Sequence, residues 1–268
     1  MRALRGVGVL VTRPVEQTEP LCRLLESMGA TTLRLPAIGI EGGFDIAALL
    51  HRVALADPFD FVIFTSANAV KFGSALLGAK CDRDLAAIGP ATARALAEAG
   101  HEVNLRPAGG FDSESLLRHP AFSHLTGRRV LLVKGLHGRE FLQEELVRRG
   151  ADVLAASVYR RVPIDYTAAE LAPVESAMSS GTIQVVTATS VEIAVRLLEL
   201  ATPLLRGQFE RVHWLVPGGR VAESLRAGGL AAPILTADSA DDQDLAAALL
   251  RWRSSASSES SAARESGA

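Results

Sequence analysis

The stretch "GRRVLLVKGLHGRE" (residues 127–140) is an apolar, strand-like run that ends in a glycine-containing turn with a lysine at its edge. Strand-to-helix turns of this kind bind phosphate in many nucleotide-binding proteins. The pattern also occurs earlier in the chain, because residues 6–19 read "GVGVLVTRPVEQTE". The relation between these two stretches indicates the fold.

An offset of 121 residues aligns the two regions without a gap. The matched positions are Gly6/Gly127, Val9/Val130, Leu10/Leu131, Arg13/Lys134, Glu19/Glu140, Leu25/Leu146, Gly29/Gly150, Ala30/Ala151 and Leu33/Leu154. Three further blocks repeat in the same order: 61–70 with 185–194, 88–100 with 217–229, and 112–117 with 241–246. Ordered self-similarity is the signature of a duplicated unit. The chain is therefore predicted to contain two copies of one α/β unit.

Each copy alternates short Val-, Ile- and Leu-rich runs with amphipathic segments. In the first copy, residues 7–12 predict a strand, residues 16–29 a helix closed by Gly29, and residues 31–38 another strand. This alternation is typical of α/β proteins with a parallel sheet. We therefore predict two similar lobes, each an open parallel sheet flanked by helices.

The composition excludes several classes of protein. The chain has 268 residues, 48% of them hydrophobic, and its 28 basic and 30 acidic side chains give a net charge of -2. Such a balance gives no general attraction for nucleic acid. Cys22 and Cys81 lack metal-ligand spacing, and the six histidines are scattered, so neither a metal site nor a disulfide framework is predicted.

The two ends of the chain carry no recognisable structural signal. The N-terminus lacks the apolar core of a signal peptide, and no run of about 18 apolar residues could span a membrane. We therefore expect a cytoplasmic protein with no membrane partner. Residues 254–268, "SSASSESSAARESGA", contain no periodic apolar positions, so a disordered tail is expected there.

The opening stretch does not match a nucleotide-binding motif. Such a motif would require G-x-G-x-x-G or G-x-x-x-x-G-K-[ST], and "KGLHGREF" (residues 134–141) is neither. Its counterpart "RPVEQTEP" (residues 13–20) contains no glycine. The turn therefore shows no sign of a phosphate-binding motif.

The order of several motifs resembles the uroporphyrinogen-III synthase family of tetrapyrrole biosynthesis, from about residue 6 to residue 250. The motifs are "VTRP" (11–14), "FTSANAV" (64–70), "AIGPATARAL" (87–96), "DSESLL" (112–117), "VLLVKGLHGREFLQEELVRRGADV" (130–153) and "VYRR" (158–161). The resemblance implies two α/β lobes between which the chain crosses twice in extended strands.

The resemblance also changes the expected domain boundaries. The repeat alone suggests a cut near residue 126, whereas the family fold implies a discontinuous first lobe, residues 1–36 plus 166–253, and a second lobe, residues 40–160. The proline-bearing, β-rich segments 35–42 and 158–165 are suited to be the two crossings.

The function implied by the resemblance is a cyclisation. The family converts the linear tetrapyrrole hydroxymethylbilane to uroporphyrinogen III in a cleft between the lobes, with loss of water and inversion of the last ring. The enzyme would thus be a lyase. No cofactor is implied, and we expect a monomer, in transient contact at most with the preceding pathway enzyme. The catalytic task is mainly to hold a flexible substrate, which carries eight carboxylates, in the productive geometry.

Candidate substrate-binding residues lie at predicted strand-to-helix turns, where helix starts offer free N–H groups to carboxylates. Thr65 and Ser66 occupy one such turn, and Thr189 and Ser190 occupy the equivalent turn of the second copy. The alternative for both pairs is a plain helix cap without a ligand.

The segment 88–100 offers Gly89 for close backbone approach and Thr92 as a hydroxyl donor, which the resemblance places in the cleft. The second copy has Val221 in place of Thr92, so backbone groups or Arg220 would contribute there instead. Ser113 is also a candidate, although a helix cap is its more common role.

Basic residues form a further group of candidates. Arg13 and Lys134 end equivalent strands, at the sheet edge where open α/β proteins bind ligands. Gly135 and Arg139 belong to the same turn as Lys134, and Arg139 could equally pair with a neighbouring glutamate. Arg160 and Arg161 should point to opposite faces of their strand, so one of them at most would face the cleft.

By resemblance, Tyr159 is the cleft tyrosine of the family, an assisting and not essential group that could hydrogen-bond the departing hydroxyl. The alternative is an aromatic residue that packs between the lobes. Two rival functions also stay open: a non-catalytic, bilobal small-molecule binding protein or sensor, and a nucleotide-dependent transferase.

Overall fold

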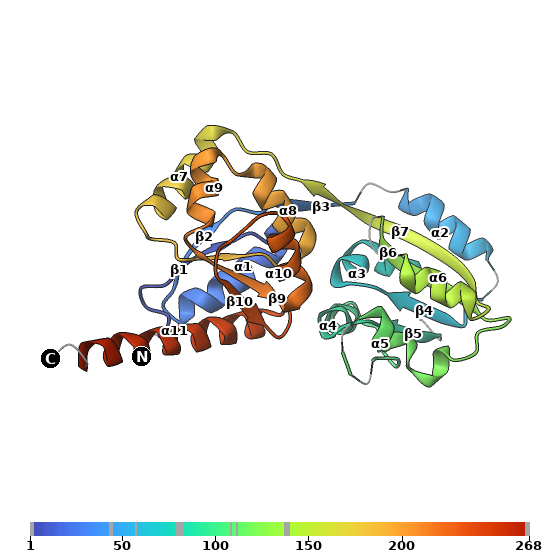
Figure 1. Cartoon of the computed structure of the whole chain (residues 1–268). Coiled ribbons are helices and arrows are strands. Elements are labelled where there is room, and N and C mark those ends of the chain that lie inside the picture. Colours follow the sequence, from blue (N-terminus) through green and yellow to red (C-terminus); the bar gives the residue numbers. More distant parts are fainter. Residues whose placement is uncertain are drawn as a thin grey trace. The chain divides into compact units, whose positions relative to one another are not determined.

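The structure is a computed structural model that describes residues 3–42, 45–56, 58–78, 83–107, 109–110, 112–136 and 140–265 (Figure 1). The chain divides into two compact units. Unit 1 comprises residues Met1–Gly39 and Pro163–Ala268, and unit 2 comprises Ile40–Val162. The chain therefore passes between the units twice. Among the described residues, no helix is long and apolar enough to cross a membrane.

Unit 1 is built on a five-stranded sheet in the order β10-β9-β8-β1-β2. All neighbouring strands in it are parallel. Its strands are β1 (Gly8–Val11), β2 (Thr31–Arg34), β8 (Val185–Thr187), β9 (His213–Pro217) and β10 (Ile234–Ala237). Its helices are α1 (Val15–Ser27), α7 (Ala168–Ser179), α8 (Val191–Leu200), α9 (Pro203–Phe209), α10 (Gly218–Ala227) and α11 (Asp242–Glu265).

Unit 2 contains the second sheet, in the order β3-β7-β6-β4-β5. Its strands are β3 (Ile38–Glu41), β4 (Phe61–Phe64), β5 (Asp84–Ala87), β6 (Arg129–Gly135) and β7 (Asp152–Pro163). Its helical segments are α2 (Ile46–Leu55), α3 (Ala67–Gly73), η1 (Ser74–Leu77), α4 (Pro90–Glu98), α5 (Ser113–Leu117), η2 (Pro120–Phe122) and α6 (Phe141–Arg148). The predicted α/β class with open, mostly parallel sheets is confirmed for both units.

The two sheets repeat one strand order, and each combines strands from both sequence copies. In unit 1, β2-β1-β8-β9 run in the order that β7-β6-β4-β5 follow in unit 2. A parallel bridge between Ala86 and Leu105 occupies the place that β10 takes beside β9. Unit 1 thus takes β1 and β2 from the first copy and β8 to β10 from the second. A cut near residue 126 would fall inside unit 2, because strands of both copies are paired there.

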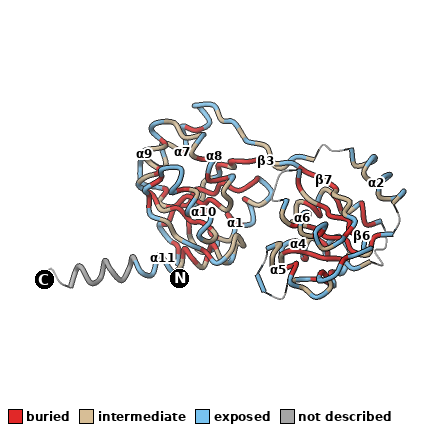
Figure 2. The backbone as a smooth tube through the Cα atoms, turned by 45° about the vertical axis from the view of Figure 1, so that its right-hand side comes forward, coloured by how far each residue is buried: buried red, intermediate tan, exposed pale blue. Residues whose placement is uncertain are grey.

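Helices cover both faces of each sheet, because successive strand residues point to opposite sides. In unit 1, Leu10 packs with α7 to α10 on one face, whereas Val9 and Val11 pack with α1 and α11 on the other. In unit 2, Val62 and Phe64 face α2 to α4, and Phe61 and Ile63 face α5 and α6. Figure 2 shows the resulting pattern, with buried segments at the centre of each unit.

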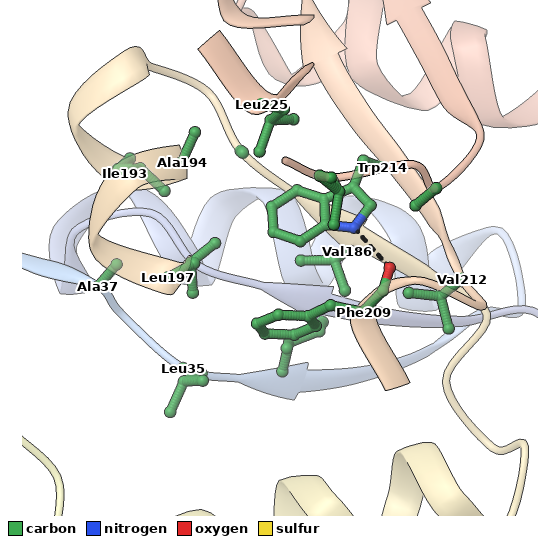
Figure 3. Packing of buried hydrophobic residues seen from close by; sticks show 14 of the residues in the cluster. Leu35, Ala37, Val186, Ile193, Ala194, Leu197, Phe209, Val212, Trp214 and Leu225 are labelled. Atoms are coloured by element: carbon green, nitrogen blue, oxygen red, sulfur yellow. Dashed lines mark hydrogen bonds between the residues drawn. The ribbon is translucent and has the colours of Figure 1, made fainter. Parts of the chain in front are cut away.

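The core of unit 1 centres on Trp214 of β9, whose side chain is fully buried (Figure 3). Its indole N–H donates a hydrogen bond to the Phe209 carbonyl at 3.0 Å, and the two rings meet nearly edge to face, 5.1 Å between centroids. Burial of an indole ring is favourable when its N–H has a partner. Val186 and Leu197 belong to the same buried cluster, so the Trp214 ring lies in a core to which β8, β9, α8 and α9 all contribute.

Cys22 is buried in α1, and burial raises the pKa of its thiol. Cys81 lies outside the described residues. Helix α11 continues to Glu265, so residues 254–265 are helical where we expected a disordered tail. The first half of α11 packs in the core of unit 1, where Leu245 and Leu249 are buried.

Candidate functional site

The strand-to-helix turn after β4 places Thr65 and Ser66 at the carboxyl end of the unit 2 sheet. Ser66 is the N-cap of α3, and its Oγ accepts a hydrogen bond from the Ala69 N–H at 3.1 Å. The Thr65 hydroxyl donates to the Val133 carbonyl at 3.3 Å, so it braces β4 against β6. Of the two hydroxyls, only that of Ser66 serves the helix start.

Tyr159 of β7 reaches the same turn. Its hydroxyl lies 3.1 Å from Ser66 Oγ, and its ring stacks against Phe72 with 6.2 Å between centroids. The residue is 4% exposed and belongs to the buried cluster of unit 2. Tyr159 and Ser66, 93 positions apart, are thus brought into contact by the parallel packing of β4, β6 and β7.

Gly135, at the end of β6, lies opposite Tyr159 in the register of the sheet. A Cβ at this position would be 2.7 Å from Tyr159 Cζ and 3.1 Å from its hydroxyl oxygen. The glycine is therefore required by the space that the phenol ring occupies. The sequence motif placed Gly135 in an anion-facing turn but did not indicate this contact.

Lys134 has a carboxylate partner within unit 2. Its Nζ lies 2.9 Å from both carboxylate oxygens of Glu140 and 3.4 Å from Gln143 Oε1. The lysine side chain is 12% exposed and that of Glu140 is 51% exposed. Any other anion at this position would compete with Glu140. Arg139, a candidate from the same turn, lies outside the described residues.

The turn after β5 carries Gly89 and Thr92. Gly89 is the N-cap of α4 and has extended backbone angles, and Pro90 occupies the first helical position. Thr92 is 4% exposed. Its hydroxyl has no hydrogen-bond partner among the described residues. Helices α3 and α4 pack against each other, so the starts of both helices lie at the same edge of the sheet.

Ser113 does not cap helix α5. The cap is Asp112, whose carboxylate accepts a hydrogen bond from the Ser115 N–H at 2.7 Å, and Ser113 is the first helical residue. The alternative role of Ser113 as a helix cap is therefore excluded, and its assignment as a substrate-binding residue stays a prediction. Aspartate and serine are about equally good N-caps, and the sequence "DSES" offers both, so the local backbone decides between them.

Unit 1 repeats part of this arrangement. Ser190 is the N-cap of α8, and its Oγ accepts from the Ile193 N–H at 3.2 Å. Thr189 precedes it and is half-buried. Val221, at the position equivalent to Thr92, is buried in the core, and Arg220 beside it is exposed. The unit 1 edge thus has a serine cap but no counterpart of the Thr92 hydroxyl.

Arg13, at the end of β1, is 9% exposed and pairs with Asp242 at the start of α11. Its Nε is buried without a hydrogen-bond partner among the described residues. Strands β1 and β6 are equivalent in the repeat, and the basic residue near the end of each meets a carboxylate from a helix start, Asp242 in unit 1 and Glu140 in unit 2. The sequence repeat indicated the two cations but not their partners.

The arginines of the crossing strand have different environments. Arg160 is exposed and pairs with Glu41 at 3.0 Å, both side chains being about half exposed. Arg161 is half-buried and has an interaction partner of its own. The alternation along β7 therefore separates the two side chains.

A second feature lies at the opposite, amino-terminal edge of the unit 2 sheet. A groove of about 780 Å³ is lined by Leu117, Arg118, Ser123, His124, Arg148 and Arg149. Its positive charge is partly neutralised, because Arg148 and Arg149 both pair with Glu145 and lower the pKa of that carboxyl to about 2. Arg149 also donates to the Leu117 and Phe122 carbonyls, so it mainly holds the loop before β6.

The carboxyl edge of each sheet presents hydroxyl groups, a capped helix start and one basic residue. Each of these sets contains groups that can donate hydrogen bonds to carboxylates. No group of three or more His, Cys, Asp or Glu suited to a metal ion occurs within the described part of the chain.

Comparison with known proteins agrees with the sequence resemblance. Residues 19–247 match the family described as "Uroporphyrinogen-III synthase HemD". The uroporphyrinogen-III synthase of Escherichia coli K12 is 32% identical over 91% of this chain and 100% of its own length. That of Salmonella typhimurium LT2 is 34% identical with the same coverage of both chains.

Solved structures show the same fold. A mutant uroporphyrinogen III synthase from the extremely thermophilic bacterium Thermus thermophilus has a TM-score of 0.59 and 25% identity, with 91% of this chain and 98% of that chain covered. The uroporphyrinogen-III synthetase of Helicobacter pylori 26695 has a TM-score of 0.56 at 17% identity, with 92% and 99% covered. The second similarity concerns the fold alone.

Proposed function

This chain belongs to the uroporphyrinogen-III synthase family, and from that premise we propose that it cyclises hydroxymethylbilane to uroporphyrinogen III. The proposed reaction removes the terminal hydroxyl of the linear tetrapyrrole as water. The resulting azafulvene closes onto the last pyrrole ring through a spiro intermediate, and that ring is inverted. The enzyme would be a cyclising lyase that acts as a monomer.

Family membership carries this proposal, and the polar groups at the sheet edges support it. The substrate has eight carboxylates, which require many hydrogen-bond donors. The capped helix starts at Ser66 and Ser190, together with Lys134, supply such donors from both units. We assign substrate binding to these residues and, in addition, to Arg13, Thr65, Gly89, Thr92, Ser113, Gly135, Arg139 and Thr189. Tyr159 is assigned an assisting, non-essential catalytic role.

The proposed reaction requires no strong acid–base pair. The hydroxyl of the substrate leaves readily, and uncatalysed closure gives the uninverted isomer. The enzyme therefore has to hold the chain so that the disfavoured carbon is attacked, and to stabilise a short-lived cation. Contacts from many hydroxyl and N–H groups suit that task, because each restricts one part of a flexible substrate.

An isomer assay tests the function. Hydroxymethylbilane is generated in situ, the protein is added, and the oxidised products are separated into type I and type III porphyrins. We expect a catalytic shift to type III that is proportional to protein concentration. Only type I product from folded protein at high concentration would rule the activity out.

A non-catalytic, bilobal binding protein is the alternative, because the same sheet edges could retain a carboxylate-rich ligand without converting it. Calorimetric titration with a stable porphyrinogen analogue, run beside the isomer assay, separates the two functions. Binding without any type III product would favour the binding protein.

A further inference from the structure

The groove at the amino-terminal edge of the unit 2 sheet has an excess of positive charge. Arg118, Arg148 and Arg149 line it, and none of its described lining residues is acidic. Glu145 pairs with both Arg148 and Arg149, so two guanidinium groups share one carboxylate. Arg118 has no carboxylate partner among the described residues. Three arginines against one glutamate leave two positive charges in excess, in a chain whose net charge is -2.

Two of the three guanidinium groups are held in place by bonds within unit 2. Arg118 donates to Ser115 Oγ at 2.7 Å, and Ser115 is only 3% exposed. Arg149 donates to the carbonyls of Leu117 and Phe122, at 2.6 and 2.9 Å. Side chains that are already ordered lose less conformational entropy when a ligand binds. These arginines are therefore better prepared to bind an anion than free basic side chains on a surface.

A role in helix stability explains only part of this cluster. Basic side chains at the carboxyl end of a helix stabilise it, and Arg148 and Arg149 lie at the end of α6. Arg118, at the end of α5, bonds instead to a serine hydroxyl. The side chain of His124, also in the groove, has no partner within the described part of the chain. Arg118 and His124 thus line the groove without a group of opposite charge.

We propose that this groove binds an acidic segment of a partner protein, whose carboxylates pair with Arg118 and Arg148. A guanidinium group binds a carboxylate through two parallel hydrogen bonds. Both arginines are exposed, and the Arg148 side chain is 72% exposed. Such exposure favours a segment that lies across the surface, because a small-molecule site encloses most of its ligand. Ser123 and His124, which are also exposed, can donate to further carboxylates.

The position of the groove separates this contact from the proposed catalytic residues of unit 2. Its residues precede β6 and β7, whereas Ser66 and Lys134 lie at the carboxyl ends of β4 and β6. A protein segment in the groove therefore leaves the carboxyl edge of this sheet free. We expect Arg118→Gln and Arg148→Gln to form type III product at the wild-type rate in the isomer assay. The proposal itself does not depend on the proposed function, because binding is measured without substrate.

Peptide binding to the full chain tests the proposal. A fluorescein-labelled peptide in which glutamate alternates with serine is titrated with the protein, and fluorescence anisotropy is recorded. We expect binding to the wild type and none of a matched peptide with glutamine in place of glutamate. Arg118→Gln and Arg148→Gln should each weaken binding about 10-fold, the effect of one lost hydrogen bond to a charged group.

Arg52→Gln is the control variant. Arg52 is exposed in the last turn of α2, so the substitution removes the same charge from a helix end of the same unit, away from the groove. Because salt screens charges that are not in contact with the peptide, the affinity should stay within about twofold of the wild type at physiological salt. If Arg52→Gln weakens binding as much as Arg148→Gln does, the attraction is not specific to the groove and the proposal is wrong.

Two further outcomes would overturn the proposal. One is the absence of peptide binding to folded wild-type protein. The other is calorimetric binding of inorganic pyrophosphate that Arg118→Gln abolishes, without peptide binding, because the groove would then be a site for small anions. Should Arg118→Gln fold poorly in urea unfolding experiments, Arg148→Gln decides the result, because Glu145 retains Arg149 as its partner in that variant.

Discussion

Gly135 and Tyr159 are opposite one another in strands β6 and β7, and the phenol ring occupies the space that any side chain at position 135 would need. The strand register changes between Lys134 and Gly135, and the Leu136 N–H donates to the Tyr159 carbonyl at 2.7 Å. The backbone at the end of β6 thus passes close to the Tyr159 side chain and bonds to its carbonyl. This relationship connects the turn motif "VKG" to a residue on the crossing strand.

Gly135→Ala should displace the Tyr159 ring and weaken its bond to Ser66. We expect a loss of about 1–3 kcal/mol in the free energy of unfolding, as for other overpacked sites, together with a higher KM. Urea unfolding and the isomer assay measure the two effects. Gly109→Ala is a suitable control, because nothing lies within 4 Å of a Cβ there. Equal stability of Gly135→Ala and wild type would contradict the crowding.

Glu140→Gln should strengthen substrate binding. The substitution removes the carboxylate that pairs with Lys134 and leaves the lysine charge for a substrate carboxylate. Because Glu140 is largely exposed, we expect KM to fall by roughly two- to fivefold and the stability to change by less than about 1 kcal/mol. Glu144→Gln is the control. It also removes one negative charge, but at an exposed position of α6 that does not pair with Lys134. A KM that rises in Glu140→Gln would show that the pair itself is needed.

Thr92→Val preserves the volume of a buried side chain and removes its hydroxyl, as the second copy does naturally with Val221. If substrate contacts are distributed over many donors, kcat/KM should fall by no more than about 10-fold, the effect of one hydrogen bond. Thr92→Ala, measured in parallel, reports the added effect of lost volume. A several-hundred-fold loss in Thr92→Val would identify one dominant hydroxyl instead.

The stability of unit 1 should depend on pH through His213. Burial lowers the pKa of this histidine below its ordinary value of 6.5, and its ring lies 4.9 Å from that of Trp252. As the pH falls through 6.5, the unfolded chain binds the proton first, so stability is lost between 6.5 and the lowered folded pKa. Urea midpoints at about pH 7.5 and about pH 5.5, on either side of the ordinary histidine pKa, should therefore differ more for the wild type than for His213→Gln. If the urea midpoint changes by the same amount between the two pH values in the wild type and in His213→Gln, this residue is excluded as a source of the pH dependence.

Much of the architecture could be predicted from the sequence, because it follows from local patterns. The alternation of apolar runs with amphipathic segments predicts parallel α/β sheets, and the matched blocks predict a duplication. The apolar periodicity of a strand or a helix is visible within a short segment of the chain. It therefore predicts these elements without knowledge of the tertiary structure. The serines in "TSANAV" and "TSVEIA" likewise cap the helices that follow them, because capping is decided within about four residues.

The contacts that define the candidate site were decided by the tertiary structure. Tyr159 meets Ser66 and Gly135 because β4, β6 and β7 are neighbours in one sheet, and Arg13 meets Asp242 across 229 positions of sequence. Which copy supplies each strand of a sheet also depends on pairing between distant segments. The sequence by itself determined the repeated unit and its elements. Long-range packing determined the partners of each side chain, because burial and hydrogen bonding depend on proximity in space and carry no local signal in the chain.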